Sequence, residues 1–98
     1  MSKFGELISA NVPVLFNFFT DWNEDTVAMN VVLRNVAAAL GDKAKVIKID
    51  IEKNPELSEA LRIKGVPTFI IYKNGEMKWR QSGVQDDNTL IHHLQQFY

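Results

Sequence analysis

The sequence predicts an α/β fold in which helices cover both faces of a mixed four-stranded sheet. Three observations predict it. An apolar run at 14–19 (VLFNFF) is hydrophobic on both of its alternating faces apart from Asn17, as expected of a central strand covered on each side. Helical and strand patterns alternate from residue 4 to residue 72, which is typical of strands joined by crossover helices. The dipeptide Asn74-Gly75 then suits a type I′ turn between two antiparallel strands.

The first half of the chain contains two predicted helices around the central strand, followed by a second strand. A short N-terminal helix is indicated by Phe4, Leu7 and Ile8 at helical spacing. A long helix is predicted from Asn23 to Leu40, with Gly41 as its C′ residue. Its apolar positions recur with helical period and are Ala28, Met29, Val32, Leu33, Val36, Ala37 and Leu40. Strand 45–51 has three isoleucines on one face and a mixed second face, which is typical of an edge or partly covered position.

The second half contains a helix, a hairpin and a last helix. Asn54-Pro55 starts a predicted helix, with Asn as N-cap and Pro at N1, which stops near Lys64-Gly65. Strand 68–72 is apolar after its first residue, and in its hairpin partner 76–82 the alternation places Met77 and Trp79 on one face, opposite Lys78 and Arg80. The stripe of the last helix is Leu90, Ile91, Leu94 and Phe97. The helix-joined first two strands should be parallel, with a right-handed crossover.

Length and charge limit the possible classes of function. With 98 residues, 46% hydrophobic and 23% charged, residues 1–98 should form one globular domain. A net charge of −1 offers no field to attract nucleic acid or an anionic membrane. No apolar run reaches the roughly 18–20 residues needed to span a bilayer, and the N-terminus lacks the pattern of a secretory signal. We therefore expect a cytoplasmic protein with no nucleic-acid or membrane partner.

The chain contains no cysteine, which excludes disulfides, thiolate nucleophiles, Cys-ligated zinc and dithiol redox chemistry. His92 and His93 are adjacent on a predicted helix and therefore point about 100° apart, which does not suit shared metal ligation. Thr20 and Thr26 carry hydroxyls but have no evident base near them in the sequence. We expect no metal, no cofactor and no catalytic residue.

Two segments carry a resemblance to a known family: PVLFNFFTDW at 13–22 and KIDIEKNPELSEALRIKGVPTFIIYKNGE at 48–76. Together with the element order, they resemble thioredoxin from about Val12 to Leu94, without the first strand of the longer family members. The resemblance implies the thioredoxin fold and a cis-proline loop at Val66-Pro67. It also implies that Gly83 lies near the family's substrate groove.

The resemblance fails after Trp22, where the family has Cys-Gly-Pro-Cys and this chain has Asn23-Glu24-Asp25-Thr26. In the family, the first cysteine attacks as a thiolate and the second resolves the mixed disulfide. An amide and an unactivated hydroxyl do neither. The family's buried aspartate aligns with Asn17, its helix-kinking proline with Val31, and its nearby lysine with Lys48, which would lack a charged partner.

Two interpretations of the substituted segment stay open. In the first, Asn23 caps the long helix, and Glu24 and Asp25 complement its dipole. Each of these residues would stabilise the helix by about 1 kcal/mol or less. Alternatively, Asp21, Glu24 and Asp25 form an acidic recognition patch.

The leading functional hypothesis is a redox-inactive binding module. Its peptide-binding groove would be formed by Trp22, Val66, Pro67, Gly83 and Val84 and would hold an extended peptide or another protein. An enzyme of unknown non-thiol chemistry at the same helix N-terminus is one alternative, and a structural adaptor subunit is another. The sequence leaves the identity of the partner, the pathway and the oligomeric state open.

Overall fold

The computed structural model describes residues 3–98, and its elements follow the predicted order. No helix within this range is long and apolar enough to cross a membrane. The elements are α1 (Lys3–Ile8), β1 (Val14–Phe19), α2 (Thr26–Leu40), the 3₁₀ turn η1 (Gly41–Lys43), β2 (Lys45–Asp50), α3 (Pro55–Ala60), β3 (Thr68–Lys73), β4 (Glu76–Ser82) and α4 (Asp87–Gln95).

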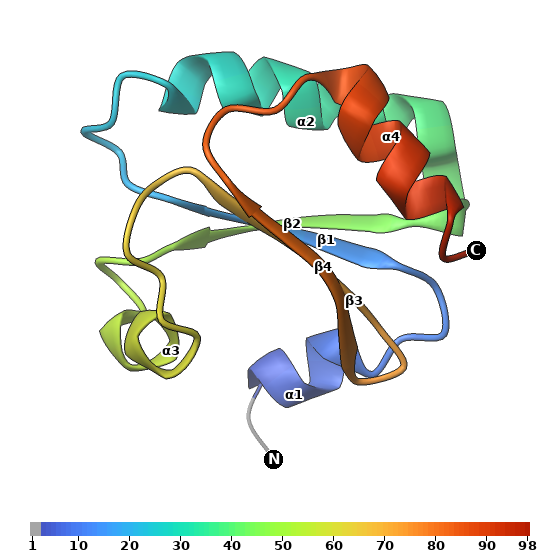
Figure 1. Ribbon diagram of the computed structural model, residues 1–98, viewed down its shortest axis with the longest axis horizontal. Coiled ribbons are helices and arrows are strands. Elements are labelled where there is room, and N and C mark those ends of the chain that lie inside the picture. The colour runs from blue at the N-terminus through green and yellow to red at the C-terminus, as the bar shows by residue number, and fades with distance from the viewer. Residues whose placement is uncertain (1–2) are drawn as a thin grey trace.

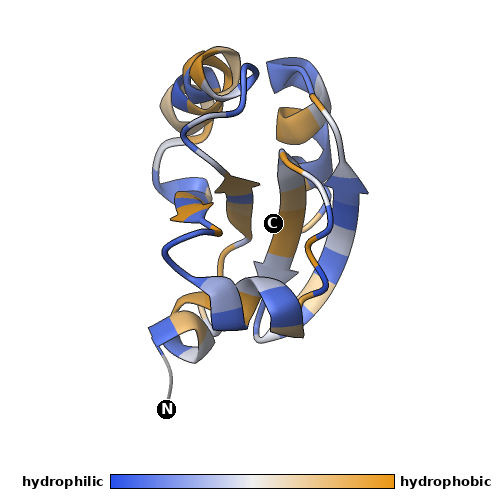
Figure 2. Cartoon of the chain, turned by 90° about the vertical axis from the view of Figure 1, so that its left-hand side faces the viewer, coloured by the Kyte–Doolittle hydropathy of each residue, from blue (hydrophilic) through white to orange (hydrophobic). Residues whose placement is uncertain are grey.

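The strands form one mixed sheet in the order β2-β1-β3-β4. Strand β1 runs parallel to β2 and antiparallel to β3, and β3 runs antiparallel to β4. Helices α2 and α4 cover one face, and α1 and α3 lie against the other (Figures 1 and 2). The predicted fold class is therefore confirmed, with β1 in the interior of the sheet and β2 at its edge.

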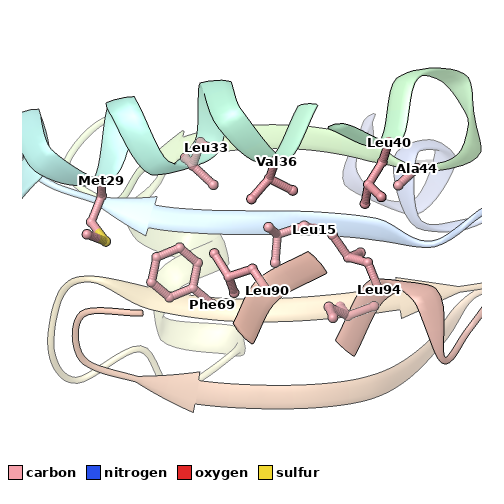
Figure 3. Close-up of a cluster of buried hydrophobic side chains, with 10 residues drawn as sticks. Leu15, Met29, Leu33, Val36, Leu40, Ala44, Phe69, Leu90 and Leu94 are labelled. Atoms are coloured by element: carbon pink, nitrogen blue, oxygen red, sulfur yellow. The ribbon is translucent and has the colours of Figure 1, made fainter. Parts of the chain in front are cut away.

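Each face of the sheet has its own hydrophobic core. Figure 3 shows Leu33, Val36 and Leu40 of α2 directed at the sheet, with Leu90 and Leu94 of α4 beside them. The opposite core contains Val14, Phe16, Phe18, Ile70 and Tyr72, and α1 and α3 pack on it. Because β1 contributes to both cores, its two apolar faces are explained.

Helix α2 begins at Thr26, three residues later than the sequence predicts. The segment before it forms turns instead: the Asn23 N–H donates to the Thr20 carbonyl (3.3 Å), and the Thr26 N–H donates to the Asn23 carbonyl (3.2 Å). Asp25 occupies the N-cap position, and its carbonyl accepts from the Met29 N–H (2.9 Å). The prediction of Asn23 as N-cap is therefore wrong.

The predicted alternation of β4 is also wrong in one respect. The pairing with β3 shifts register between Ile71 and Tyr72, so that Trp79 lies opposite Ile71 while Met77 lies opposite Tyr72. An extra residue in one strand breaks the two-residue alternation, and these two side chains therefore face opposite sides of the sheet. Trp79 lies on the α4 side, where its ring stacks on that of His93 with the ring centroids 4.3 Å apart.

Helix α3 ends at Ala60, and Arg80 of β4 holds the chain that follows. Its guanidinium donates to the Leu61 carbonyl (2.6 Å) and to the Arg62 carbonyl (2.9 Å). Arg62 has a φ of 55°, in the left-handed region, which ends the helix before this residue. The predicted end near Lys64-Gly65 is therefore wrong.

We expect Arg80→Met to lower the free energy of unfolding by about 1–2 kcal/mol, because it removes two charge-assisted hydrogen bonds from carbonyls at a helix C-terminus. Urea unfolding followed by circular dichroism measures the change. Lys78→Met is the matched control, since the exposed Lys78–Glu76 pair (2.8 Å) should be worth little. Equal effects of the two substitutions would contradict the anchoring role.

Helix α4 begins with a capped turn. The Asp86 side chain accepts from the Thr89 N–H (2.7 Å), and this hydrogen bond holds the pKa of the carboxyl below its usual value. The cap therefore stabilises the folded protein fully at pH values above the ordinary carboxyl pKa. This stabilisation is lost as the pH falls through the lowered pKa of the folded state.

Candidate functional site

The candidate site lies where β1 ends and three loops meet: residues 20–25, 61–67 and 83–86 (Figure 1). The Trp22 side chain is 72% exposed. Its indole N–H donates to the Glu52 carboxylate in the turn after β2 (2.9 Å). The indole is thus held at one edge while most of its surface faces solvent.

Asn23 links the first loop to the second. Its side-chain oxygen accepts from the Asp25 N–H (2.8 Å), which closes an Asx turn, and its side-chain nitrogen reaches the Val66 carbonyl at 3.5 Å. The latter distance is at the outer limit of a hydrogen bond. Thr26 donates its hydroxyl to the Thr20 carbonyl (2.7 Å), so this hydroxyl is bound to an acceptor that is not a general base.

The second and third loops are joined at Pro67. The Val66–Pro67 peptide bond is cis, and Pro67 is buried. The Gly83 N–H donates to the Pro67 carbonyl (2.8 Å), and Gly83 has a φ of 96°, a conformation that L side chains rarely adopt. No hydrogen bond within residues 3–98 uses the Val66 N–H.

The apolar side chains of the predicted groove differ in accessibility. Val84 is 55% exposed, whereas Val66 is partly buried. Hydrogen bonds connect Asn23 with Val66 and Gly83 with Pro67. Trp22 directly precedes Asn23 in the chain, and Val84 directly follows Gly83. The structure therefore brings the three loops of the predicted groove together.

Comparison with known proteins decides the family. The thioredoxin family model matches residues 1–96. A chloroplastic thioredoxin Y from rice is 38% identical over 96% of this chain and 56% of its own length. Thioredoxin from Rickettsia bellii is 31% identical over 88% of this chain and 82% of its own length.

The chain belongs to the thioredoxin family. Among solved structures, a mutant thioredoxin from Halobacterium salinarum superposes with a TM-score of 0.88 at 28% identity, covering 99% of this chain and 84% of the other. Chloroplastic thioredoxin z superposes with a TM-score of 0.84, also at 28% identity, covering 93% of this chain and 82% of the other. The predicted thioredoxin fold is thereby confirmed.

Asn17, Lys48 and Val31, the three further positions that the resemblance singled out, lie in β1, β2 and α2. Asn17 is fully buried, and neither polar atom of its side chain has a hydrogen-bond partner within residues 3–98. Lys48 does not reach it: its ammonium group donates to the Asn30 side-chain oxygen (3.0 Å) and lies over the Phe19 ring. Val31, which aligns with the family's helix-kinking proline, lies inside α2, and this helix is continuous from Thr26 to Leu40.

Sequence reasoning missed Glu52 as a residue of the site. Its backbone N–H donates to the Asp50 side chain (2.9 Å), and this turn after β2 presents its carboxylate to Trp22. The two residues are thirty positions apart. No local pattern could therefore have paired them, although an acidic side chain directly after an edge strand was a visible signal.

The acidic residues of the substituted segment have no ion pair among the described residues. Asp21 and Glu24 are exposed, and Asp25 is partly buried at the N-cap position without a side-chain capping bond. The capping interpretation thus fails for the Asn23 side chain, while Glu24 and Asp25 still lie at the positive end of α2.

Proposed function

We propose that this chain is a redox-inactive thioredoxin-family protein that binds an extended segment of a partner protein against Val66 and Pro67. The observation that carries the proposal is the Val66 backbone: its N–H has no acceptor within residues 3–98, and its carbonyl has only the long 3.5 Å contact with Asn23. An extended peptide could pair with both groups, as in other cases of strand addition.

The surroundings of Val66 support an apolar contact as well. The exposed indole of Trp22 and the exposed Val84 side chain provide surface that a partner side chain could cover. Aromatic side chains of this kind often dominate the binding free energy of an interface. The Glu52 contact fixes one edge of the indole, which lowers the conformational entropy lost on binding.

The absence of cysteine supports the redox-inactive part of the proposal. Electron exchange with a disulfide needs a thiolate, and neither Asn23 nor Thr26 supplies one. An insulin-reduction assay on the purified chain should show no activity above the rate with reductant alone, and measurable turnover would contradict this part.

The binding part is tested with peptides selected by display on the wild-type chain and then titrated by calorimetry. We expect Trp22→Ala to weaken binding roughly thirtyfold, the effect of losing an aromatic anchor worth about 2 kcal/mol. Met77→Ala is the matched control, because Met77 is also an exposed apolar side chain (45%) but lies on β4. Unchanged affinity of the Trp22 variant would refute the groove.

A further inference from the structure

The outer edge of β2 has unpaired backbone groups. Strand β2 is an edge strand of the sheet. The Lys45 N–H donates to the carbonyl of Pro13, just before β1, and the Ile51 N–H donates to the carbonyl of Phe19, the last residue of β1, both at 3.0 Å. Because successive residues of a strand direct their backbone groups to opposite sides, the even-numbered residues of β2 face outward. Their groups have no partner within residues 3–98, apart from the Asp50 carbonyl, which accepts from the Asn54 side chain (2.9 Å).

The two edges of the sheet differ in how well they would accept another strand. Both edge strands carry charged side chains, but β4 also has a register shift, which discourages edge-to-edge pairing. Strand β2 pairs with β1 in regular register over all of Lys45–Asp50. An added strand would thus meet a regular hydrogen-bonding edge only at β2.

An apolar hollow of about 420 Å³ lies beside this edge on the α1 and α3 side of the sheet. Side chains from both helices and from β2 form its apolar wall, which includes Phe4, Leu7, Ile47, Ile49 and Leu57. Charged side chains line the hollow as well: Lys3, Lys48, Asp50 and Lys53. The side chains of the apolar wall are only partly buried, so they leave apolar surface for further contact.

A second hollow, of about 320 Å³, lies beside the same edge on the α2 side. Arg34 and Lys48 line it together with Val46. Within residues 3–98, neither cation has an ion pair, and Lys48 contacts only the neutral Asn30 and the Phe19 ring. The two sides of the edge therefore differ in their apolar surface: the α1 and α3 side combines a broad apolar wall with charged side chains, whereas the α2 side presents two cations and no carboxylate.

We propose that the outer edge of β2 binds an extended segment of a partner protein in which apolar and acidic residues alternate. Paired with the free groups of Val46 and Lys48, such a segment directs successive side chains to opposite faces of the sheet. Its apolar side chains enter the hollow between α1 and α3, and its carboxylates meet Lys48 and Arg34. This surface is separate from the Trp22 groove and does not depend on it.

The test uses the full chain labelled with ¹⁵N and a blocked Val-Glu-Val-Glu-Val peptide. We expect chemical-shift changes and slowed hydrogen exchange at the amides of Val46, Lys48 and Asp50. A Val-Lys-Val-Lys-Val peptide, with the same apolar side chains and opposite charge, should bind at least roughly tenfold more weakly because it faces Arg34 and Lys48.

Charge-reversal variants locate the site. Arg34→Glu and Lys48→Glu should each weaken the acidic peptide roughly tenfold, whereas Lys78→Glu, an equal charge change on the opposite edge strand, should leave it unchanged. Equal binding of both peptides would overturn the proposal. So would loss of binding in Trp22→Ala, which would assign the peptide to the groove, or protection of the β2 amides by self-association without peptide.

Discussion

Replacing Asn23 and Thr26 together with cysteine should give this chain disulfide-reductase activity that the wild type lacks. The two positions flank one turn, closed by the hydrogen bond from the Thr26 N–H to the Asn23 carbonyl (3.2 Å). The Asp25 N–H already points at the side chain of position 23 (2.8 Å), where it would stabilise a thiolate. The scaffold around the missing motif is therefore largely in place.

The gain should be modest, because Glu24 and Asp25 would raise the thiol pKa and Asn17 offers no proton acceptor behind the site. We expect insulin reduction on the order of tenfold above the wild-type background. The single Asn23→Cys and Thr26→Cys variants are the controls and should lack turnover, since neither has a resolving partner. A double variant that forms no internal disulfide by mass spectrometry would contradict the geometry of this turn.

Asn17→Asp should destabilise the protein by about 3–5 kcal/mol at pH 7, the cost of a buried carboxylate without a partner. Lys48 cannot compensate in its present position, because it is bound to Asn30 (3.0 Å). Asn17→Leu keeps the branching and the number of side-chain heavy atoms but is larger. It should instead stabilise the protein by about 1 kcal/mol, because the removal of two unpaired polar atoms from the core outweighs the cost of the added volume.

The pH dependence separates charge from packing in this pair of variants. In the Asn17→Asp variant, burial raises the pKa of the introduced carboxyl in the folded state above its unfolded value. Below the unfolded pKa both states are protonated, and stability relative to wild type falls as the pH rises above it. Urea titrations between about pH 4 and pH 8 measure the slope. A pH-independent loss would show that the carboxyl finds a partner or reaches solvent.

Several features of the fold follow from short segments of sequence. The two apolar faces of 14–19 predicted a covered interior strand, and β1 contributes to both cores. Asn74-Gly75 predicted the hairpin turn, and both residues have positive φ, at 53° and 83°. The mixed second face of strand 45–51 predicted an edge or partly covered position, and β2 is an edge strand, with the isoleucines at 47, 49 and 51 packed against a core.

Other features depended on contacts between distant segments. The register shift in β4 is defined by its pairing with β3, and a period of two in the sequence does not reveal it. The Glu52 contact with Trp22 and the Arg80 contacts with Leu61 and Arg62 join residues that are far apart in the chain. The turn at Asn23 replaced a helix start because the Thr20 and Asn23 carbonyls accepted the N–H groups of this segment.

By itself, the sequence determined that this chain cannot exchange electrons through a thiol and that it folds around a central apolar strand, because composition and periodicity are local properties. Only the tertiary structure decided that Asn17 is buried without a partner among the described residues and that Lys48 is bound to Asn30. It also decided that the β2 edge lies between a hollow with a broad apolar wall and one lined by Arg34 and Lys48. The reason is that burial and hydrogen-bond partners depend on which segments meet in space.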